Sequence, residues 1–321
     1  MTERERFIRT LKREPIGGRV PTFELVFYLT MEAFGKVHPD HRSYHQWNQM
    51  SKNEQRLIIE DEADLFIDTA RRYHHSAIFV HAQPYDLETR IRLYETIREK
   101  SGDEFFLMAH GDPTFAMPDG TNMMDFSVRM YEDMDGLKKE AAERTAHEIA
   151  MAEELDRRGH LIDGFALCSD YCFNVNPFFT PDIFGELITP YLKEAIDAYR
   201  AMGFYSIKHT DGNIMPIMDQ MVQCGPDAIH SLDPQGGVDL AEVSARWGDK
   251  VALIGNVNCG LLQTGSEEEC IADIRRSLKQ GMARGAGYIF ATSNCAYTGL
   301  PLERYELMND IWYREGIYPE K

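Results

Sequence analysis

The segment Thr180–Asn213, TPDIFGELITPYLKEAIDAYRAMGFYSIKHTDGN, contains one complete helix–strand unit followed by polar residues. Thr180 and Pro181 predict a helix start, because Thr caps free backbone N–H groups and Pro fits the first helical turn. Apolar residues then recur at steps of one, three and four, which predicts an amphipathic helix that ends near Gly203. The run Phe204–Lys208 predicts a short buried strand, and the polar residues HTDGN follow it directly.

The same alternation of short apolar runs and helical segments recurs along the whole chain. The predicted strands are Val20–Phe27, Ser76–Val80, Glu104–Ala109, Leu161–Leu167, Phe204–Lys208, Asp227–Leu232, Lys250–Ile254 and Gly287–Ala291. The predicted helices are Asn53–Tyr73, Met134–Arg158, Pro181–Met202, Ile214–Gln223, Val238–Arg246, Glu267–Met282 and Leu300–Ile311. Strands joined by crossover helices are parallel. Eight such units favour an α/β fold with one (β/α)₈ barrel domain over residues 1–321, rather than an open doubly wound sheet, which usually needs fewer strands.

The composition excludes several classes of partner. The chain has 321 residues and a formal net charge of −18, from 34 Lys+Arg and 52 Asp+Glu. Nucleic acids and anionic membranes bind basic surfaces, so we expect neither as a main partner. The start, MTERERFIRTLKREP, lacks the apolar stretch of a secretory signal, and no run approaches the ~18 apolar residues of a membrane span. With only six cysteines, which are too sparse for a disulfide framework, we expect a cytoplasmic protein.

Polar and ionisable residues stand at nearly every predicted strand end, where barrel enzymes carry their chemistry. In strand order they are Glu24; His81; His110 and Asp112; Cys168, Asp170 and Tyr171; His209, Asp211 and Asn213; His230; Asn256 and Cys259; and Asn294 and Cys295. A single His or Cys at such a place is more often a packed structural residue than a ligand. Their recurrence at one end of the strands is the main indication of an enzyme.

Three of these residues predict a metal site when they are considered together. His209, Cys259 and Cys295 end the fifth, seventh and eighth predicted strands, so they can converge on one ion. Imidazole and thiolate suit Zn²⁺, and three protein ligands with an open fourth position are typical of catalytic zinc. Asp211 and His230 are competing or additional ligands, and Asp211 could instead support a ligand or anchor a substrate.

Several motifs distributed over nearly the whole chain resemble those of the uroporphyrinogen decarboxylase superfamily. They are Thr2–Phe7 and Arg19–Pro21 near the start, Phe179–Pro181, Pro190–Lys193 and His209–Asn213 in the centre, and Gly255–Val257, Gly265–Glu268, Asn294-Cys295 and Leu300–Glu303 near the end. The resemblance implies a (β/α)₈ barrel, and it does not specify the substrate.

Two branches of this superfamily differ in what they bind. The decarboxylases hold a tetrapyrrole with eight carboxylates by arginines after the first strand, whereas Pro21–Tyr28 contains Glu24 and no Arg. A carboxylate that faces a polyanion in a low-dielectric site is repulsive, which disfavours this branch. The resemblance therefore points to the cobalamin-dependent methyltransferases, which act in coenzyme M methylation and in the O-demethylation of methoxylated aromatics.

Similarity to the coenzyme M enzymes implies a zinc site built from His-x-Cys after the fifth strand and a Cys after the eighth. His209 matches the first ligand and Cys295 the last, but Asp211 stands at the middle position. Either Asp211 binds the metal as an oxygen donor, or Cys259 or His230 takes that place. The Asp-Gly-Asn form of the segment is more similar to the broader methyltransferase-like and O-demethylase relatives.

We therefore expect a zinc-dependent methyltransferase that moves a methyl group between a small substrate and a corrinoid (cobalamin) carried by a partner protein. The substrate is a methoxylated aromatic or a thiol acceptor, and the zinc acts as a Lewis acid. The alternatives are a decarboxylase of a carboxylated substrate and a non-catalytic corrinoid- or tetrapyrrole-binding protein, and a homodimer is compatible with the sequence. The expected ligands are His209, Cys295, Cys259 and His230; the catalytic residues Asp211, Asp170 and Tyr171; and the substrate-binding residues Glu24, His81, His110, Asn213 and Asn256.

Overall fold

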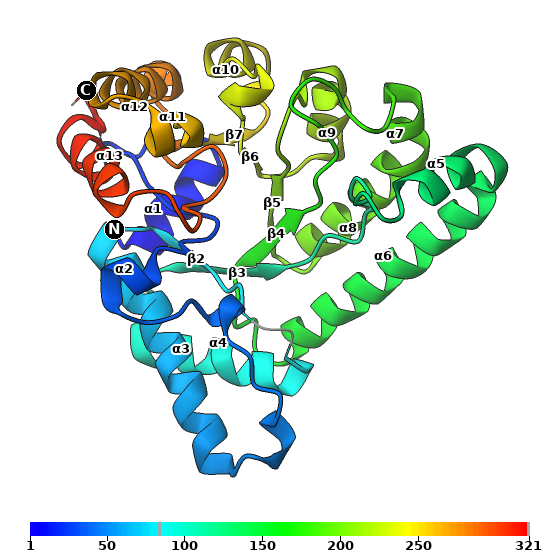
Figure 1. Cartoon of the computed structure of the whole chain (residues 1–321), viewed down its shortest axis with the longest axis horizontal. Helices are drawn as coiled ribbons and strands as arrows, with labels where there is room; N and C mark the ends of the chain where they lie inside the picture. Colours follow the sequence, from blue (N-terminus) through cyan, green and yellow to red (C-terminus); the bar gives the residue numbers. More distant parts are fainter. Residues whose placement is uncertain (83–84, 320–321) are drawn as a thin grey trace.

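Seven parallel strands form one curled sheet in the order β2-β3-β4-β5-β6-β7-β8 (Figure 1). The computed structural model describes residues 1–82 and 85–319. Strand order equals chain order, so every crossover leads to the neighbouring strand, as in a barrel. The strands are β2 (Ala77–Phe79), β3 (Phe106–His110), β4 (Gly164–Cys168), β5 (Tyr205–His209), β6 (Ala228–His230), β7 (Ala252–Ile254) and β8 (Tyr288–Ile289). These seven predicted strands are confirmed, and we call the rim formed by their C-terminal ends the mouth.

The predicted first strand, Val20–Phe27, is not a strand in the structure. Pro21 has no N–H to donate to a ladder, and Thr22 makes only isolated bridges to the residues beside β2 and β8. The N–H of Ser76 donates to the carbonyl of Thr22 at 2.7 Å, and that of Phe290 donates to the carbonyl of Pro21 at 2.9 Å. The segment thus lies between the two sheet edges without a ladder to either one. The α/β fold with a parallel sheet is confirmed, whereas a closed barrel of eight strands is not.

Helices surround the sheet in Figure 1, most of them on its outer face. They are α1 (Glu3–Leu11), α2 (Thr30–Phe34), α3 (Lys52–Tyr73), α4 (Leu87–Ser101), α5 (Met123–Glu132), α6 (Met134–Arg157), α7 (Pro181–Leu187), α8 (Thr189–Ala201), α9 (Met218–Cys224), α10 (Leu240–Trp247), α11 (Cys259–Thr264), α12 (Glu267–Gly281) and α13 (Leu302–Glu315). The predicted helix Pro181–Met202 is divided at Ile188, because Pro190 cannot continue the hydrogen-bond ladder of the first part. None of these helices is long and apolar enough to cross a membrane.

The two ends of the chain close the opposite side of the sheet from the mouth. Strand β1 (Gly18–Arg19) pairs antiparallel with β9 (Ile317–Tyr318), so two segments from opposite ends of the sequence lie side by side (Figure 1). Helix α1 packs against β2, β3 and β8, and its Phe7 and Leu11 are buried in the core inside the sheet. The apolar core therefore begins at α1 and ends below the mouth.

Side chains alternate between the inside of the sheet and the helices, as the pleat of a strand requires. Ile207 of β5 and Ala228 of β6 belong to the inner core. His209 and His230 lie two residues further along the same strands, so they face the same interior and end it at the mouth. Lys208, which lies between Ile207 and His209 on β5, faces the opposite side of the sheet. The strand period thus separates a polar mouth from the apolar core below it.

Two buried histidines away from the candidate ligands predict a loss of stability in acid. Burial lowers the pKa of His75 to about 3, and burial together with nearby His81 lowers that of His38 to about 3. The unfolded imidazole titrates near 6.5, so the stability from each neutral histidine is full above that pH and decreases as the pH falls toward the folded pKa. Between pH 7 and pH 5, each should cost about 2 kcal/mol of unfolding free energy.

His75→Gln can keep the hydrogen bond to Tyr305. In urea unfolding, we expect its free energy of unfolding to fall by about 2 kcal/mol less than that of wild type between pH 7 and pH 5. The exposed His45→Gln is the matched control and should unfold with the wild-type pH dependence. Equal slopes for wild type and His75→Gln would contradict the account.

Candidate metal centre

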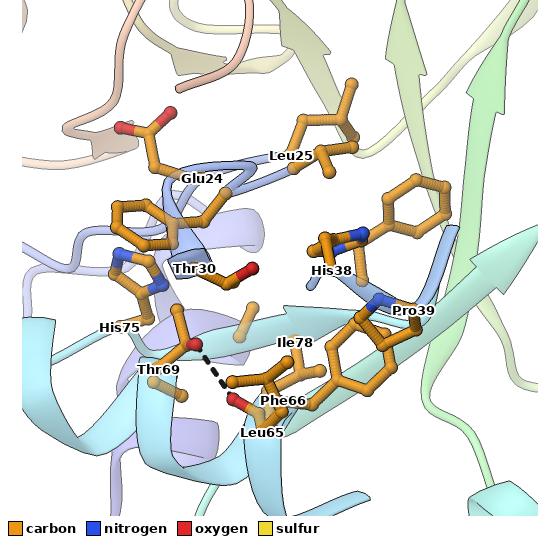
Figure 2. A pocket seen from close by; sticks show the side chains of 15 residues that line it. Glu24, Leu25, Thr30, His38, Pro39, Leu65, Phe66, Thr69, His75 and Ile78 are labelled. Carbon is orange, nitrogen blue, oxygen red and sulfur yellow. Dashed lines mark hydrogen bonds between the residues drawn. The ribbon is translucent and has the colours of Figure 1, made fainter. Parts of the chain in front are cut away.

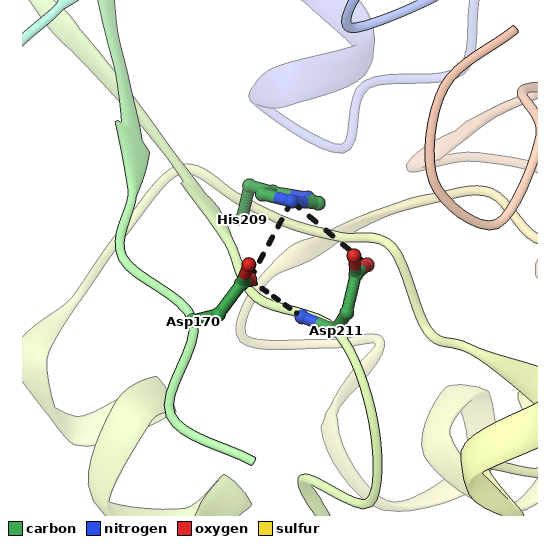
Figure 3. Close-up of side chains that lie close together, drawn as sticks. All are labelled: Asp170, His209 and Asp211. Atoms are coloured by element: carbon green, nitrogen blue, oxygen red, sulfur yellow. Dashed lines mark hydrogen bonds and ion pairs between the residues drawn. The ribbon is translucent and has the colours of Figure 1, made fainter. Parts of the chain in front are cut away.

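Three groups that can hold a metal ion meet at the ends of β4 and β5 (Figure 3). Nε2 of His209 lies 3.7 Å from Oδ1 of Asp170 and 3.8 Å from Oδ1 of Asp211. The three donor atoms all lie within 4.8 Å of one another. The register of the parallel pair places Cys168 of β4 opposite His209, so the loops that follow both strands run side by side. Two of the predicted catalytic residues and one predicted ligand are thus brought together.

The spacing of these atoms suits a shared cation better than direct hydrogen bonds. Distances of 3.7 and 3.8 Å are too long for a hydrogen bond. Nitrogen and oxygen ligands about 2.0–2.1 Å from a tetrahedral zinc are roughly 3.3–3.4 Å apart, so small side-chain movements would allow all three to bind one ion. One imidazole and two carboxylates are acceptable ligands for zinc.

Asp211 is held in place through both carboxylate oxygens. Ser231 Oγ donates to Oδ1 at 2.7 Å, and Asn294 Nδ2 donates to Oδ2. The backbone N–H of Asp211 donates to Oδ1 of Asp170 at 3.1 Å. Burial raises the pKa of Asp211, His209 opposes this change, and Asp170 adds to it. Residues after β6 and β8 therefore fix this carboxylate at the mouth, and Asp170 after β4 holds the backbone of Asp211.

His209 and His230 are hydrogen-bonded through their Nδ1 atoms at 2.8 Å, and both rings are buried. Burial lowers the pKa of His230 well below its ordinary value, so this ring is neutral at pH 7 and its Nδ1 can accept a hydrogen bond. The tautomer in which His209 donates leaves the lone pair of its Nε2 toward the carboxylates. Metal-binding histidines use their second nitrogen in this way. The geometry makes His230 the outer partner of His209, and its predicted role as a ligand stays a prediction.

The two predicted cysteine ligands lie together near the ends of β7 and β8. Sγ of Cys259 is 3.8 Å from the carbonyl oxygen of Cys295. Burial raises the pKa of Cys259 to about 12 and raises that of Cys295 as well, so both are thiols at neutral pH without a metal. Within residues 1–82 and 85–319, no cysteine joins the group of Asp170, His209 and Asp211. Metal binding through these cysteines stays a prediction.

A buried ion pair behind the mouth was not predicted from the sequence. Nζ of Lys208 lies 2.7 Å from Oδ2 of Asp112 and donates to the carbonyl oxygen of Ser169 at 2.9 Å, and both charged side chains are buried. Burial acts to raise the pKa of Asp112, but the Lys208 ammonium holds it below its ordinary value. The Ser169 N–H donates to the same carboxylate at 3.0 Å, which anchors the loop that carries Asp170. A lysine inside an apolar strand was the available indication of this pair.

Glu24 lines a small internal cavity below the mouth (Figure 2). Its oxygens accept hydrogen bonds from the Thr292 backbone N–H at 3.1 Å and from Oγ1 at 2.6 Å. Burial raises the pKa of Glu24 to about 8, so the carboxyl is mainly protonated at pH 7. The cavity, which Thr30 and His75 also line, has a volume of about 30 Å³ and can hold a water molecule but no organic substrate. Substrate binding by Glu24 stays a prediction.

Three further predicted site residues make hydrogen bonds within the structure. The hydroxyl of Tyr171 lies 2.6 Å from Oγ1 of Thr114, and the whole side chain is buried. Asn213 donates to a backbone carbonyl in the loop after β4 at 2.9 Å. Asn256 is buried and donates to the carbonyl of Leu232 at 2.7 Å. These contacts fasten the loops of the mouth, and direct roles in catalysis or substrate binding stay predictions.

His81 and His110 form a second polar group at the ends of β2 and β3. Nδ1 of His81 lies 2.6 Å from Nε2 of His110, and Nε2 of His81 lies 3.1 Å from Oδ2 of Asp40. The hydroxyl of Tyr28 donates to the same oxygen at 3.0 Å. Asp40 belongs to the long segment between Val20–Phe27 and α3, so these contacts fasten that segment over the strand ends. Substrate binding by the two histidines stays a prediction.

Removal of the Lys208 charge should destabilise the whole mouth. Lys208→Met leaves the Asp112 carboxylate buried without its cation, and we expect the unfolding free energy in urea to fall by about 3–5 kcal/mol. Lys193→Met, which breaks the exposed pair with Asp197, is the control and should cost less than about 1 kcal/mol. A cost for Lys208→Met no larger than that of the control would contradict this assignment.

Metal analysis of purified protein tests the candidate ligands. We expect about one zinc per chain in wild type and in the exposed control Asp249→Asn, and loss of zinc in His209→Gln and Asp211→Asn. Asp170→Asn and Cys295→Ser then show whether the third ligand is the carboxylate that lies there or the thiolate that the sequence predicts. Full zinc occupancy in both His209→Gln and Asp211→Asn would contradict a metal centre at this place.

Comparisons with known proteins support the superfamily assignment. Residues 169–314, which contain the whole candidate metal centre, match the family model Uroporphyrinogen decarboxylase (URO-D). No curated protein matches the chain in sequence.

Among solved structures, a methyltransferase from Methanosarcina mazei is similar in fold, with a TM-score of 0.72 and 17% identity over 98% of this chain and 99% of that one. Two other structures are less similar. One is D-psicose 3-epimerase from Clostridium cellulolyticum H10, with a TM-score of 0.46 and 10% identity over 83% of this chain and 92% of that one. The other is the putative vitamin-B12 independent methionine synthase from Listeria monocytogenes, with a TM-score of 0.47 and 13% identity over 92% of this chain and 99% of that one. The family-model match over residues 169–314 confirms the resemblance of the chain to the uroporphyrinogen decarboxylase superfamily, and the Methanosarcina structure shows a shared fold.

Proposed function

We propose that this protein is a zinc-dependent methyltransferase that moves a methyl group between a small substrate and a corrinoid carried by a partner protein. The observation that carries the proposal is the meeting of one imidazole and two carboxylates at the mouth. The match to the URO-D family and the fold shared with the methyltransferase from Methanosarcina mazei support it. The substrate class remains the one expected from the sequence, a methoxylated aromatic or a thiol.

The donor set fits the proposed metal. Nε2 of His209 and the carboxylates of Asp211 and Asp170 would hold it, with Cys295 or Cys259 as the thiolate alternative. A cation between the two carboxylates would also remove their mutual repulsion. When bound, zinc supplies Lewis acidity, which polarises an ether oxygen of a methyl donor or lowers the pKa of an acceptor thiol.

The residues around the donor atoms prepare the mouth for substrate. In the tautomer in which Nδ1 of His209 donates to His230, the Nε2 lone pair of His209 faces the carboxylates, and Ser231 fixes Asp211. Asp170 is the most accessible member of the group, with 47% of its side chain exposed. Asp170 is therefore the group best placed to orient a substrate or to move a proton at its Oδ atoms.

The mouth also offers apolar surface for a protein partner. Phe173 is 41% exposed and Val175 is 72% exposed, and both follow Asp170 in the loop after β4. Contiguous exposed apolar surface is typical of interaction sites, and these two side chains stand two residues apart in one loop. A corrinoid protein that docks on this loop would bring its cofactor to the donor group.

A second candidate function is the decarboxylation of a small carboxylated substrate. Burial raises the pKa of Asp211, which favours a carboxyl that can protonate a carbanion product. Such a reaction would continue after metal removal, whereas the proposed methyl transfer would stop.

The proposed function is tested by mixing the protein with cob(I)alamin and a panel of methoxylated aromatics, and following methylcobalamin in the visible spectrum. We expect turnover by wild type and by Asp249→Asn, and a loss of more than about 100-fold in Asp211→Asn, because even outer partners of ligands contribute 10–100-fold. A chelator should abolish turnover, and zinc should restore it.

Turnover that persists after chelation would contradict the zinc mechanism. Decarboxylation of a small carboxylated substrate that continues after chelation would instead establish the second candidate function.

A further inference from the structure

We propose that a cavity between α4 and the ends of β2 and β3 binds a small monocarboxylate through Arg90. The cavity has a volume of about 340 Å³, within the range of small-molecule sites. Its polar wall includes Arg90, His110 and Asp40, and its apolar wall includes Val80, Leu93 and Tyr94. Neither Asp170, His209 nor Asp211 lines it, so it is separate from the candidate metal centre.

Arg90 is a charged residue whose hydrogen-bonding capacity is unused. Its Nε is buried and has no hydrogen-bond partner in the part of the chain that the structure describes, and its guanidinium makes no ion pair there. Arg98 on the same helix, by contrast, donates to Asp163 at 2.7 Å and also to backbone carbonyls. The charge of Arg90 does reach Glu148, but burial still raises the pKa of that carboxyl. Arg90 as a whole is half-buried, and a half-buried guanidinium without an acceptor on its buried Nε can bind an anion.

The start of α4 adds to the positive potential beside the cavity. Arg90 lies near the N-terminus of this helix, where the macrodipole favours anions. The two acidic residues of that turn are engaged elsewhere. Asp86 accepts from the N–H of Thr89 at 2.8 Å, and Glu88 pairs with Arg158. Neither one neutralises Arg90.

Asp40 and His110, which also line the cavity, determine which ligand charge the cavity favours. Asp40 contributes a carboxylate that binds His81 and Tyr28, and burial lowers the pKa of His110 to about 4, so that ring is neutral at pH 7. Among the described residues of the wall one side chain is positive and one is negative, so a monoanion is favoured over a phosphate dianion. A carboxylate also accepts two parallel N–H bonds from Arg90.

The apolar wall selects the body of the occupant. Val80 ends the β2 side of the cavity, and Leu93 and Tyr94 come from the buried face of α4. Such a surface accepts a short hydrocarbon or one aromatic ring, while the carboxylate lies at Arg90. The inference does not depend on methyl transfer, because it concerns binding at a separate cavity.

Calorimetric titration with benzoate tests the proposal, with the neutral isostere benzamide as the reference ligand. Arg90→Met keeps the apolar stem and removes the charge, and we expect benzoate to bind at least about 10-fold more weakly than to wild type. Arg92→Met, on an exposed face of the same helix, is the matched control and should keep the wild-type affinity. Arg90→Lys keeps the charge but loses the planar pair of N–H donors, so it should bind benzoate with an intermediate affinity. This variant replaces Arg90→Met in the test if Arg90→Met does not fold.

Four results would overturn the proposal. They are no benzoate binding to wild type at millimolar concentration, equal benzoate affinity for wild type and Arg90→Met, benzamide binding as tight as benzoate, and displacement of benzoate by an equal concentration of inorganic phosphate. Each result concerns binding alone, so it leaves the proposed methyl transfer untouched.

Discussion

The buried ion pair between Lys208 and Asp112 determines how the strand ends meet at the mouth. Adjacent residues of a strand face opposite sides, so Lys208 points behind the sheet while His209 points into the mouth. The ammonium binds Asp112 after β3 and the carbonyl of Ser169 after β4, and these contacts hold the next residue, Asp170, near His209. A charge pair outside the chemistry thus sets the spacing of the candidate ligands, and its burial makes the loss of one partner costly.

The strand period explains why polar and apolar regions meet so sharply at this end of the sheet. The inner row of side chains is apolar up to Ile207 and Ala228, and the next inward positions are His209 and His230. Their rings therefore lie against a dry core, where electrostatic interactions are stronger than in water. A metal ion held by His209 would have protein on one side and the open mouth on the other, which is the arrangement of a catalytic site.

Much of the fold could be predicted because each strand is a short apolar run that ends in a polar residue. Val20–Phe27 has the same pattern, but Pro21 limits its pairing to isolated bridges, which only the three-dimensional structure reveals. Asp170, His209 and Asp211 could be predicted as candidates from their places at strand ends. Which candidates meet depends on the β4–β5 register and on loop conformation, so the sequence did not separate them from the cysteines. The proposed role of Arg90 depends on its having no partner among the residues that the structure describes, which no local sequence pattern encodes.

Zinc-edge X-ray absorption of the purified protein tests the central claim most directly, because it identifies the atoms bound to the metal. The account predicts a shell with imidazole nitrogen and carboxylate oxygen at roughly 2.0–2.2 Å, which loses an oxygen neighbour or the metal itself in Asp211→Asn. A shell without imidazole, or one with two sulfur neighbours at about 2.3 Å, would contradict a metal centre built on His209 and Asp211.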